Sequence, residues 1–179
     1  MKEARCIDER ISFVGDGLTG AYFDDEKKYR YSLWRRFHED VCLTEMAVFI
    51  GLNPSTADET EDDPTIRRCS GFARDWGRGG FVMLNLFAYR ATDPKAMKAE
   101  RNPVGPINDD VLRAVTSVGN PVVCCWGNHG IHQDCWWRVK VILHGTCKRS
   151  VFHFGLTKAG QPRHPLYLLK SSMLIRWAR

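Results

Sequence analysis

The stretch that decides the fold is "MAVFIGLNPSTAD", residues 46–58. It begins with a short, nearly continuous apolar run, which is what a strand buried on both faces of a parallel sheet requires. The run breaks at Gly51 into the polar loop 53–56. Backbone-permissive and polar residues gathered at the end of a buried strand predict a loop that binds something.

Strand and helix signals alternate after this stretch. The first helix is indicated by Asp63, which can cap a helix, and by Pro64, which suits a first helical position. The apolar residues that follow recur at helical spacing and would form one stripe. The predicted strands are 46–52, 79–90, 120–130 and 150–156, and the predicted helices are 63–77, 105–119 and 131–145. Such alternation predicts an α/β fold with three layers, α/β/α, around a four-stranded, mainly parallel central sheet.

The first 46 residues predict an extension to this core. "AYFDDEKKYRYSLWRRF", residues 21–37, has two aromatic-rich segments around a polar turn, which is typical of a β-hairpin. We expect a single domain, 1–179, with the hairpin extension in 1–46 and the core in 47–179. A strip of Arg30, Arg35 and Arg36 lies in the hairpin. It is interpreted as a solvated strand face, with contact to a phosphate backbone as the alternative.

Composition bounds the compartment and the partners. The net charge of +5 leans mildly toward polyanionic partners. No apolar stretch approaches membrane-spanning length, and the first ten residues lack a signal-peptide core. We therefore expect a cytoplasmic protein without a membrane partner.

The seven cysteines predict neither a disulfide framework nor a zinc ribbon, since their number is odd and no paired C-x-x-C occurs. His129, His132 and Cys135 are three residues apart and would share one face of a helix. A metal site needs a closed geometry, and no partner cluster accompanies them. The sequence therefore implies no metal and no cofactor.

Polar clusters follow each of the four predicted strands. In open parallel sheets, ligands bind beyond the carboxyl ends of the strands. The clusters are Asn53 to Thr56, then Asn85, then Gly127 to His129, then Arg163 and His164. Because four clusters converge on one edge, we expect one pocket there.

The order "GLNPS", "VMLNL", "VVCCWGNHG" and "RHPLYL" resembles the uracil-DNA glycosylase superfamily over about residues 47–170. The whole chain, with "GLNPSTAD", "DDPTIRR", "NLFAYRATDP" and "PRHPLY", resembles more closely a family of uncharacterised bacterial and phage proteins. The superfamily resemblance implies roles for three residues. Asn53 matches the residue that positions the attacking water, Asn85 the side chain that reads a base edge, and His164 the histidine that stabilises the departing base.

The same resemblance implies that Leu166, Tyr167 and Leu169 match a loop that wedges into a duplex when a base is flipped out. The sequence departs from the superfamily in three ways. It lacks the four spaced cysteines of the iron–sulfur branch and the serine that usually follows His-Pro, and an acidic stretch lies beside the first motif. The amide of Asn53 cannot accept a proton as a carboxylate does, so Asp58 is the candidate base.

The predicted function is hydrolysis of an N-glycosidic bond, with DNA or a nucleobase or nucleotide ligand as the partner. The candidate catalytic residues are Asn53, His164 and Asp58, and the candidate binding residues are Gly51, Pro54, Ser55, Thr56, Asn85, Arg67, Arg163 and Tyr167. Phe72 or Trp76 is the candidate for stacking on the base. Two alternatives stay open: a binding module without chemistry, and an enzyme that acts on a free nucleotide-like substrate.

Overall fold

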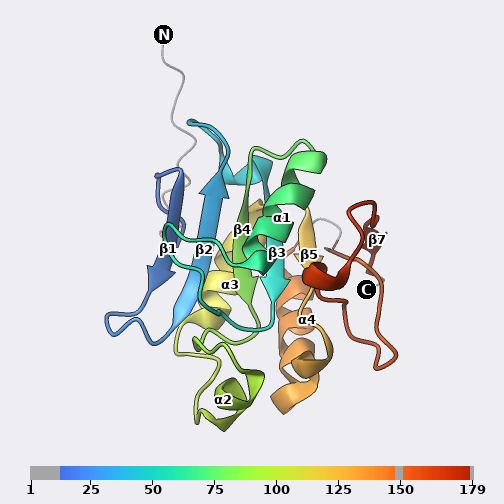
Figure 1. Cartoon of the computed structure of the whole chain (residues 1–179). Coiled ribbons are helices and arrows are strands. Elements are labelled where there is room, and N and C mark those ends of the chain that lie inside the picture. The colour runs from blue at the N-terminus through green and yellow to red at the C-terminus, as the bar shows by residue number, and fades with distance from the viewer. Residues whose placement is uncertain (1–12, 148–150, 178–179) are drawn as a thin grey trace.

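The computed structural model describes residues 13–147 and 151–177, which form one seven-stranded sheet in the order β1-β2-β4-β3-β5-β6-β7. The strands are β1 Thr19–Phe23, β2 Arg30–Arg36, β3 Met46–Gly51, β4 Gly80–Asn85, β5 Val122–Cys124, β6 Val151–His153 and β7 Ile175–Arg176. Figure 1 shows β1 at one edge of the sheet and β7 at the other.

The α/β prediction is confirmed, whereas the prediction of a four-stranded, mainly parallel sheet is wrong. The pairs β4–β3, β3–β5 and β5–β6 are parallel. The pairs β1–β2, β2–β4 and β6–β7 are antiparallel, so the sheet is mixed. The physical reason is that both flanking segments continue the ladder: they satisfy the backbone groups of β4 and β6, which would otherwise lie at open edges.

The hairpin predicted in 21–37 forms as β1 and β2, but it lengthens the sheet. Its ladder contains one irregularity, where Tyr22 pairs with Ser32 and Phe23 pairs with Arg30. Tyr31 is therefore an extra residue, a β-bulge. The bulge leaves Arg30 on the same side of the sheet as Leu33, although strict alternation would put them on opposite sides.

Helices cover both faces of the sheet, with α1 in front and α3 and α4 behind in Figure 1. The helices are α1 Pro64–Asp75, α2 Pro94–Ala99, α3 Asn108–Val118 and α4 Cys135–Thr146, with short 3-10 helices η1 Leu43–Glu45, η2 Asn128–Asp134 and η3 Pro165–Tyr167. In α1, Asp63 caps the helix and Pro64 occupies its first turn, as the sequence predicts.

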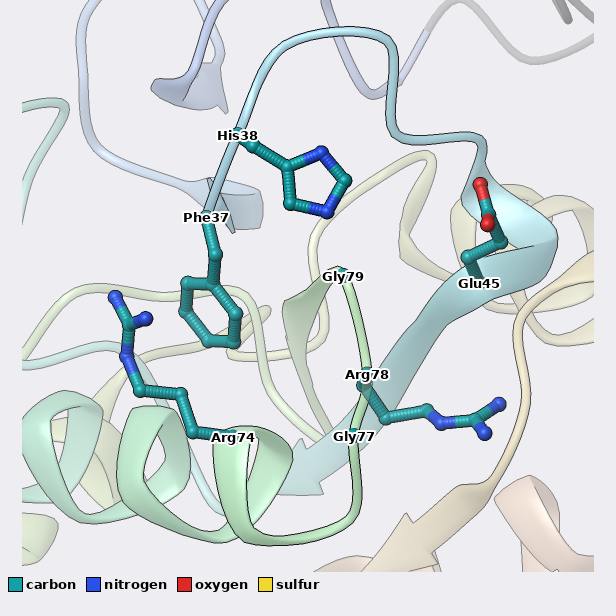
Figure 2. A pocket seen from close by; sticks show the side chains of 7 residues that line it. All are labelled: Phe37, His38, Glu45, Arg74, Gly77, Arg78 and Gly79. Atoms are coloured by element: carbon teal, nitrogen blue, oxygen red, sulfur yellow. The ribbon is translucent and has the colours of Figure 1, made fainter.

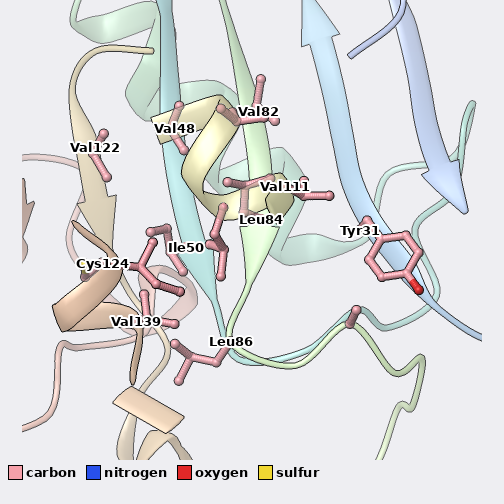
Figure 3. Packing of buried hydrophobic residues seen from close by; sticks show 14 of the residues in the cluster. Tyr31, Val48, Ile50, Val82, Leu84, Leu86, Val111, Val122, Cys124 and Val139 are labelled. Carbon is pink, nitrogen blue, oxygen red and sulfur yellow. The ribbon is translucent and has the colours of Figure 1, made fainter. Parts of the chain in front are cut away.

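The side chains of successive strand residues divide the core into two clusters. On the α1 face, Phe49 and Phe81 pack with Phe72 of the helix. On the other face, strand residues pack against α3 and α4; Figure 3 shows Ile50 and Val139 in this cluster. Within the described ranges, none of the helices has both the length and the apolar character that crossing a membrane requires.

Candidate functional site

The carboxyl ends of β3, β4 and β5 surround a cavity of about 470 Å³, which we call the carboxyl-edge pocket. Several residues of the predicted site line it: Gly51, Asn53, Ser55, Asn85, His164 and Tyr167. Arg30, Asp63, Thr65, Thr92, Asn128 and His129 also line it, together with apolar side chains that include Ile66, Met83 and Trp126. The strand ends thus bring together groups that lie far apart in the sequence.

Asn85, the last residue of β4, lies in the floor of this pocket and is only 2% exposed. Its Nδ2 is buried and has no hydrogen-bond partner among the described residues. An unpartnered buried donor costs about 1–3 kcal/mol, which a ligand acceptor would recover. Gly51 makes the room, because a Cβ at that position would lie 2.9 Å from Asn85 Oδ1.

The side chain of Asn53 is held in one orientation. Its Nδ2 donates to the carbonyl of Pro54 at 2.9 Å and to that of Ala91 at 2.7 Å. Both amide hydrogens are therefore used to join the loop after β3 to the loop after β4. Oδ1 accepts no hydrogen bond from the described residues and is left to accept one from a ligand or a water.

His164 is the residue before η3 and also lines the pocket. Its Nδ1 accepts a hydrogen bond from Leu166 N at 3.4 Å, which in the neutral ring leaves the proton on Nε2. Burial lowers the pKa of His164, and the charge of Asp63 opposes that shift. The neutral ring can therefore donate from Nε2. The Tyr167 ring lies 5.7 Å from the His164 ring and is 84% exposed.

Arg30 is buried, which corrects the interpretation of the hairpin arginines as a solvated face. Only 2% of Arg30 is exposed, and one guanidinium nitrogen donates to the Ala57 carbonyl. Within the described part of the chain, its Nε has no hydrogen-bond partner. Burial lowers the pKa of Arg30 to about 10, against the attraction of Asp63, so the side chain is charged at neutral pH. The bulge at Tyr31 explains why Arg30 lies on the α1 side together with Leu33.

Asp63 is the carboxylate among the described residues that line the pocket. Its Oδ1 accepts from Ile66 N at 2.8 Å as the cap of α1. Among the described residues, Oδ2 accepts no hydrogen bond. The sequence identified Asp63 as a cap, and nothing in its spacing distinguishes a cap that also faces a pocket.

Five residues of the predicted site do not line the pocket: Pro54, Thr56, Asp58, Arg67 and Arg163. The Asp58 carboxylate accepts hydrogen bonds from Thr60 and Glu61, and these bonds lower its pKa. Arg67 donates to the Asp62 carbonyl.

Pro54 is buried and contributes its backbone carbonyl to the loop junction, whereas Thr56 is exposed. The Arg163 side chain donates to the Leu156 carbonyl at 3.3 Å. These residues therefore support or flank the loops that carry the pocket.

Arg35 binds the acidic stretch that follows the first motif. The Arg35 guanidinium pairs with Asp62 at 2.7 Å and donates to the carbonyls of Asp58 and Glu59. Arg35 is 6% exposed, so this arginine is also buried and not part of a solvated face. The interaction keeps residues 58–62 against β2 and outside the pocket lining.

The histidine and cysteine spacing does not build a metal site in the described part of the chain. The backbone leaves helical geometry at His132 and Gln133. His129 lies 3.1 Å from Lys98 Nζ, and the Cys135 thiol donates to the Leu86 carbonyl. The three side chains therefore do not share one helix face.

A second cavity of about 470 Å³ lies where β3 and β4 begin, and we call it the amino-edge pocket. It is lined by Phe37, His38, Glu45, Arg74, Gly77, Arg78 and Gly79. Figure 2 shows Arg74 beside the Phe37 ring, 3.7 Å from its centroid. None of the predicted site residues lies in it.

The proposed stacking aromatics belong to the core. Phe72 is 2% exposed, and Trp76 stacks on both Phe72 and Phe49. The large aromatic that lines the carboxyl-edge pocket floor is Trp126, whose Nε1 donates to Gln161 at 2.9 Å. The sequence places Trp126 directly after a strand, in "CWGNHG", but its spacing does not indicate that the ring lines the pocket.

Comparison with curated proteins and with solved structures found no match. One family model matches, described as a protein of unknown function (DUF1643), over residues 30–166. The match contains every residue that lines the carboxyl-edge pocket except Tyr167. The chain therefore belongs to the DUF1643 family.

Proposed function

We propose that this protein hydrolyses the N-glycosidic bond of a nucleobase in nucleic acid, at the carboxyl-edge pocket. The observation that carries the proposal is the buried, unpartnered Nδ2 of Asn85 in the same cavity as Asn53 and His164. The order of motifs that resembles the uracil-DNA glycosylase superfamily supports the same reading.

Recognition would fall to Asn85. A planar amide reads a base edge, since it supplies donors and an acceptor in one plane. The apolar lining from Ile66, Met83 and Trp126 suits the faces of a flat ring. A base that presents an acceptor to Asn85 Nδ2 would satisfy this donor, which has no partner among the described residues.

Bond cleavage develops positive charge on the sugar and negative charge on the departing base. Asn53 Oδ1 can accept a hydrogen bond from the attacking water and so orient it. His164 Nε2 can donate to the departing base, and a preorganised donor of this kind stabilises developing negative charge. Tyr167 lines the pocket and is exposed, so its ring could contact the rest of a nucleic acid. Leu169, two residues further along the chain, is also exposed.

One observation favours a second candidate, a nucleobase-binding module without chemistry. The two hydrogen bonds of Asn53 Nδ2 join the loops after β3 and β4, and a structural role accounts for them equally well. In such a module Asn85 would still read the base, but no bond would break.

The experiment that separates the two candidates measures binding and base release on the same oligonucleotides. Single-stranded and duplex probes would each carry one uracil, hypoxanthine or oxidised purine, and mass spectrometry would detect the released base. Release of one base above the spontaneous rate supports the hydrolase. Binding of a probe without any release supports the binding module.

A further inference from the structure

Hydrolysis at this pocket needs a proton acceptor for the attacking water, and Asn53 cannot serve, because an amide does not take up a proton at neutral pH. Asp58, the carboxylate next to the first motif, does not line the pocket and is bound to its own turn. Asp63 does line it. The carboxylate available to accept the proton is therefore at the start of α1.

Asp63 is fixed in place and still has a free oxygen. Oδ1 is bound to Ile66 N at 2.8 Å, so the carboxylate cannot rotate away without breaking the helix cap. Oδ2 accepts nothing from the described residues. A carboxylate held by one oxygen presents the other in a constant direction, which proton transfer requires.

The charges that act on Asp63 come from other elements of the fold. Arg30 on β2 and His164 before η3 both interact electrostatically with it. Arg30 attracts the carboxylate but forms no ion pair with it among the described contacts. The cation therefore lies near the carboxylate without occupying Oδ2.

We propose that Asp63 is the general base of the reaction, an inference that rests on the proposed function. Asn53 Oδ1 orients the water, and the water oxygen bonds to the sugar carbon while its proton passes to Asp63 Oδ2. The bond between sugar and base breaks, and its electron pair leaves with the base, which His164 stabilises. The proton on Asp63 then returns through solvent to the base, so water and the glycoside yield a free base and a sugar hydroxyl.

The chain offers a matched control for this residue. Asp93 also precedes a proline, Pro94, and caps its helix by accepting from Lys95 N at 2.8 Å. Unlike Asp63, it is exposed and does not line the pocket. Asn and Ser cap helices about as well as Asp. Asp63→Asn and Asp63→Ser therefore remove the carboxylate and keep the cap, and Asp93→Asn reports what the same exchange does elsewhere.

The test measures turnover on the oligonucleotide that the wild type cleaves fastest, across a range of pH, with binding and thermal unfolding of each variant. We expect both Asp63 variants to lose roughly 10²-fold or more in turnover, with binding nearly unchanged. Their residual rate should rise with hydroxide concentration, since no side chain takes the proton. Asp93→Asn should retain the wild-type rate.

Each outcome decides the proposal. If the wild type releases a base and either Asp63 variant, folded and binding normally, keeps turnover within threefold, then Asp63 is a cap only and the inference fails while the proposed function stands. If the wild type releases no base from any probe, the proposed function fails and this inference fails with it.

Discussion

The carboxyl-edge pocket and the amino-edge pocket have equal volumes, about 470 Å³. They lie at opposite ends of strands β3 and β4. In the amino-edge pocket two of the polar side chains are hydrogen-bonded: Glu45 accepts from Cys42 N at 3.0 Å, and His38 Nδ1 donates to the Glu39 carbonyl at 2.9 Å. In the carboxyl-edge pocket, Asn85 Nδ2 and Arg30 Nε are buried without hydrogen-bond partners from residues 13–147 and 151–177. Volume does not separate the two, whereas unsatisfied buried groups do.

The difference follows from how strands end. At the carboxyl edge, β3 and β4 run side by side to Gly51 and Asn85, and the chain leaves each strand toward a different helix. A crevice opens between these departures. At the amino edge, surface loops meet the end of α1, and solvent reaches the polar groups. Four experiments test whether the two pockets differ in this way.

The largest effect is expected from histidines at the two edges. His164→Ala removes the donor that would stabilise the departing base, so turnover should fall by roughly 10²–10³ with little change in binding. His38→Ala, in the amino-edge pocket, should leave turnover unchanged. Steady-state and single-turnover base release would measure both. Equal losses in the two variants would show that the carboxyl-edge pocket is not the reaction site.

Two buried asparagines allow a sharper contrast. Asn85→Ala removes an unpartnered donor, so affinity for the oligonucleotide should fall by roughly tenfold, while stability changes little. Asn108→Ala removes donations from Nδ2 to the carbonyls of Asn85 and Leu86, so it should cost about 1–3 kcal/mol of stability.

Urea unfolding and fluorescence titration would measure this pair. A large stability loss in Asn85→Ala with normal affinity in the folded protein would contradict the recognition role of Asn85.

A methyl group added at Gly51 should displace the Asn85 side chain that lines the pocket. The new Cβ would lie 2.9 Å from Asn85 Oδ1 and 3.1 Å from Met83 Cε, so Asn85 must shift and affinity should fall severalfold. At Gly71 in α1, a Cβ meets nothing within 4 Å. Gly71→Ala should instead raise stability by about 0.5–1 kcal/mol. Unchanged affinity in Gly51→Ala would mean that the position of Asn85 does not matter.

The smallest effect concerns pH. Burial lowers the pKa of His164 below its ordinary value of 6.5, so the folded state binds the proton less readily than the unfolded state. The neutral His164 ring therefore costs the folded state no stability above pH 6.5, the ordinary pKa. As pH falls from 6.5 toward the lowered pKa, the unfolded state takes up the proton first and the free energy of unfolding decreases. Urea unfolding from about pH 7.5 to about pH 5 should show a smaller decline in His164→Asn than in the wild type. His132 and His153, whose pKa values burial also lowers, would supply the remaining slope.

The apolar runs predicted the inner strands well because β3 and β4 are buried on both faces and read as continuous apolar segments. The apolar stripe predicted for the first helix is also buried at Ile66, Phe72 and Ala73 of α1. The total extent of the sheet was not predictable in this way. β7 is two exposed residues, and the pairing of β2 with β4 depends on contacts between segments far apart in the chain.

The candidate site was predictable where strand ends carry polar residues, as at Asn53 and Asn85. It was not predictable where a residue has two uses. Asp63 carries the ordinary signature of a helix cap, and Arg67 carries that of a cation near a loop, yet only Asp63 lines the pocket. Side-chain direction depends on packing, which spacing alone does not record.

The bulge in β2 bears on how the pocket can be inherited. Tyr31 is the extra residue of the bulge. Arg30 therefore lies on the same side of the sheet as it would in a regular strand that lacked this residue. Loss of one residue between Arg30 and Leu33 would restore regular alternation without moving the guanidinium out of the site. Relatives that differ here by a single insertion or deletion can therefore keep the same charge in the pocket, and an alignment gap at this point need not signal a changed ligand.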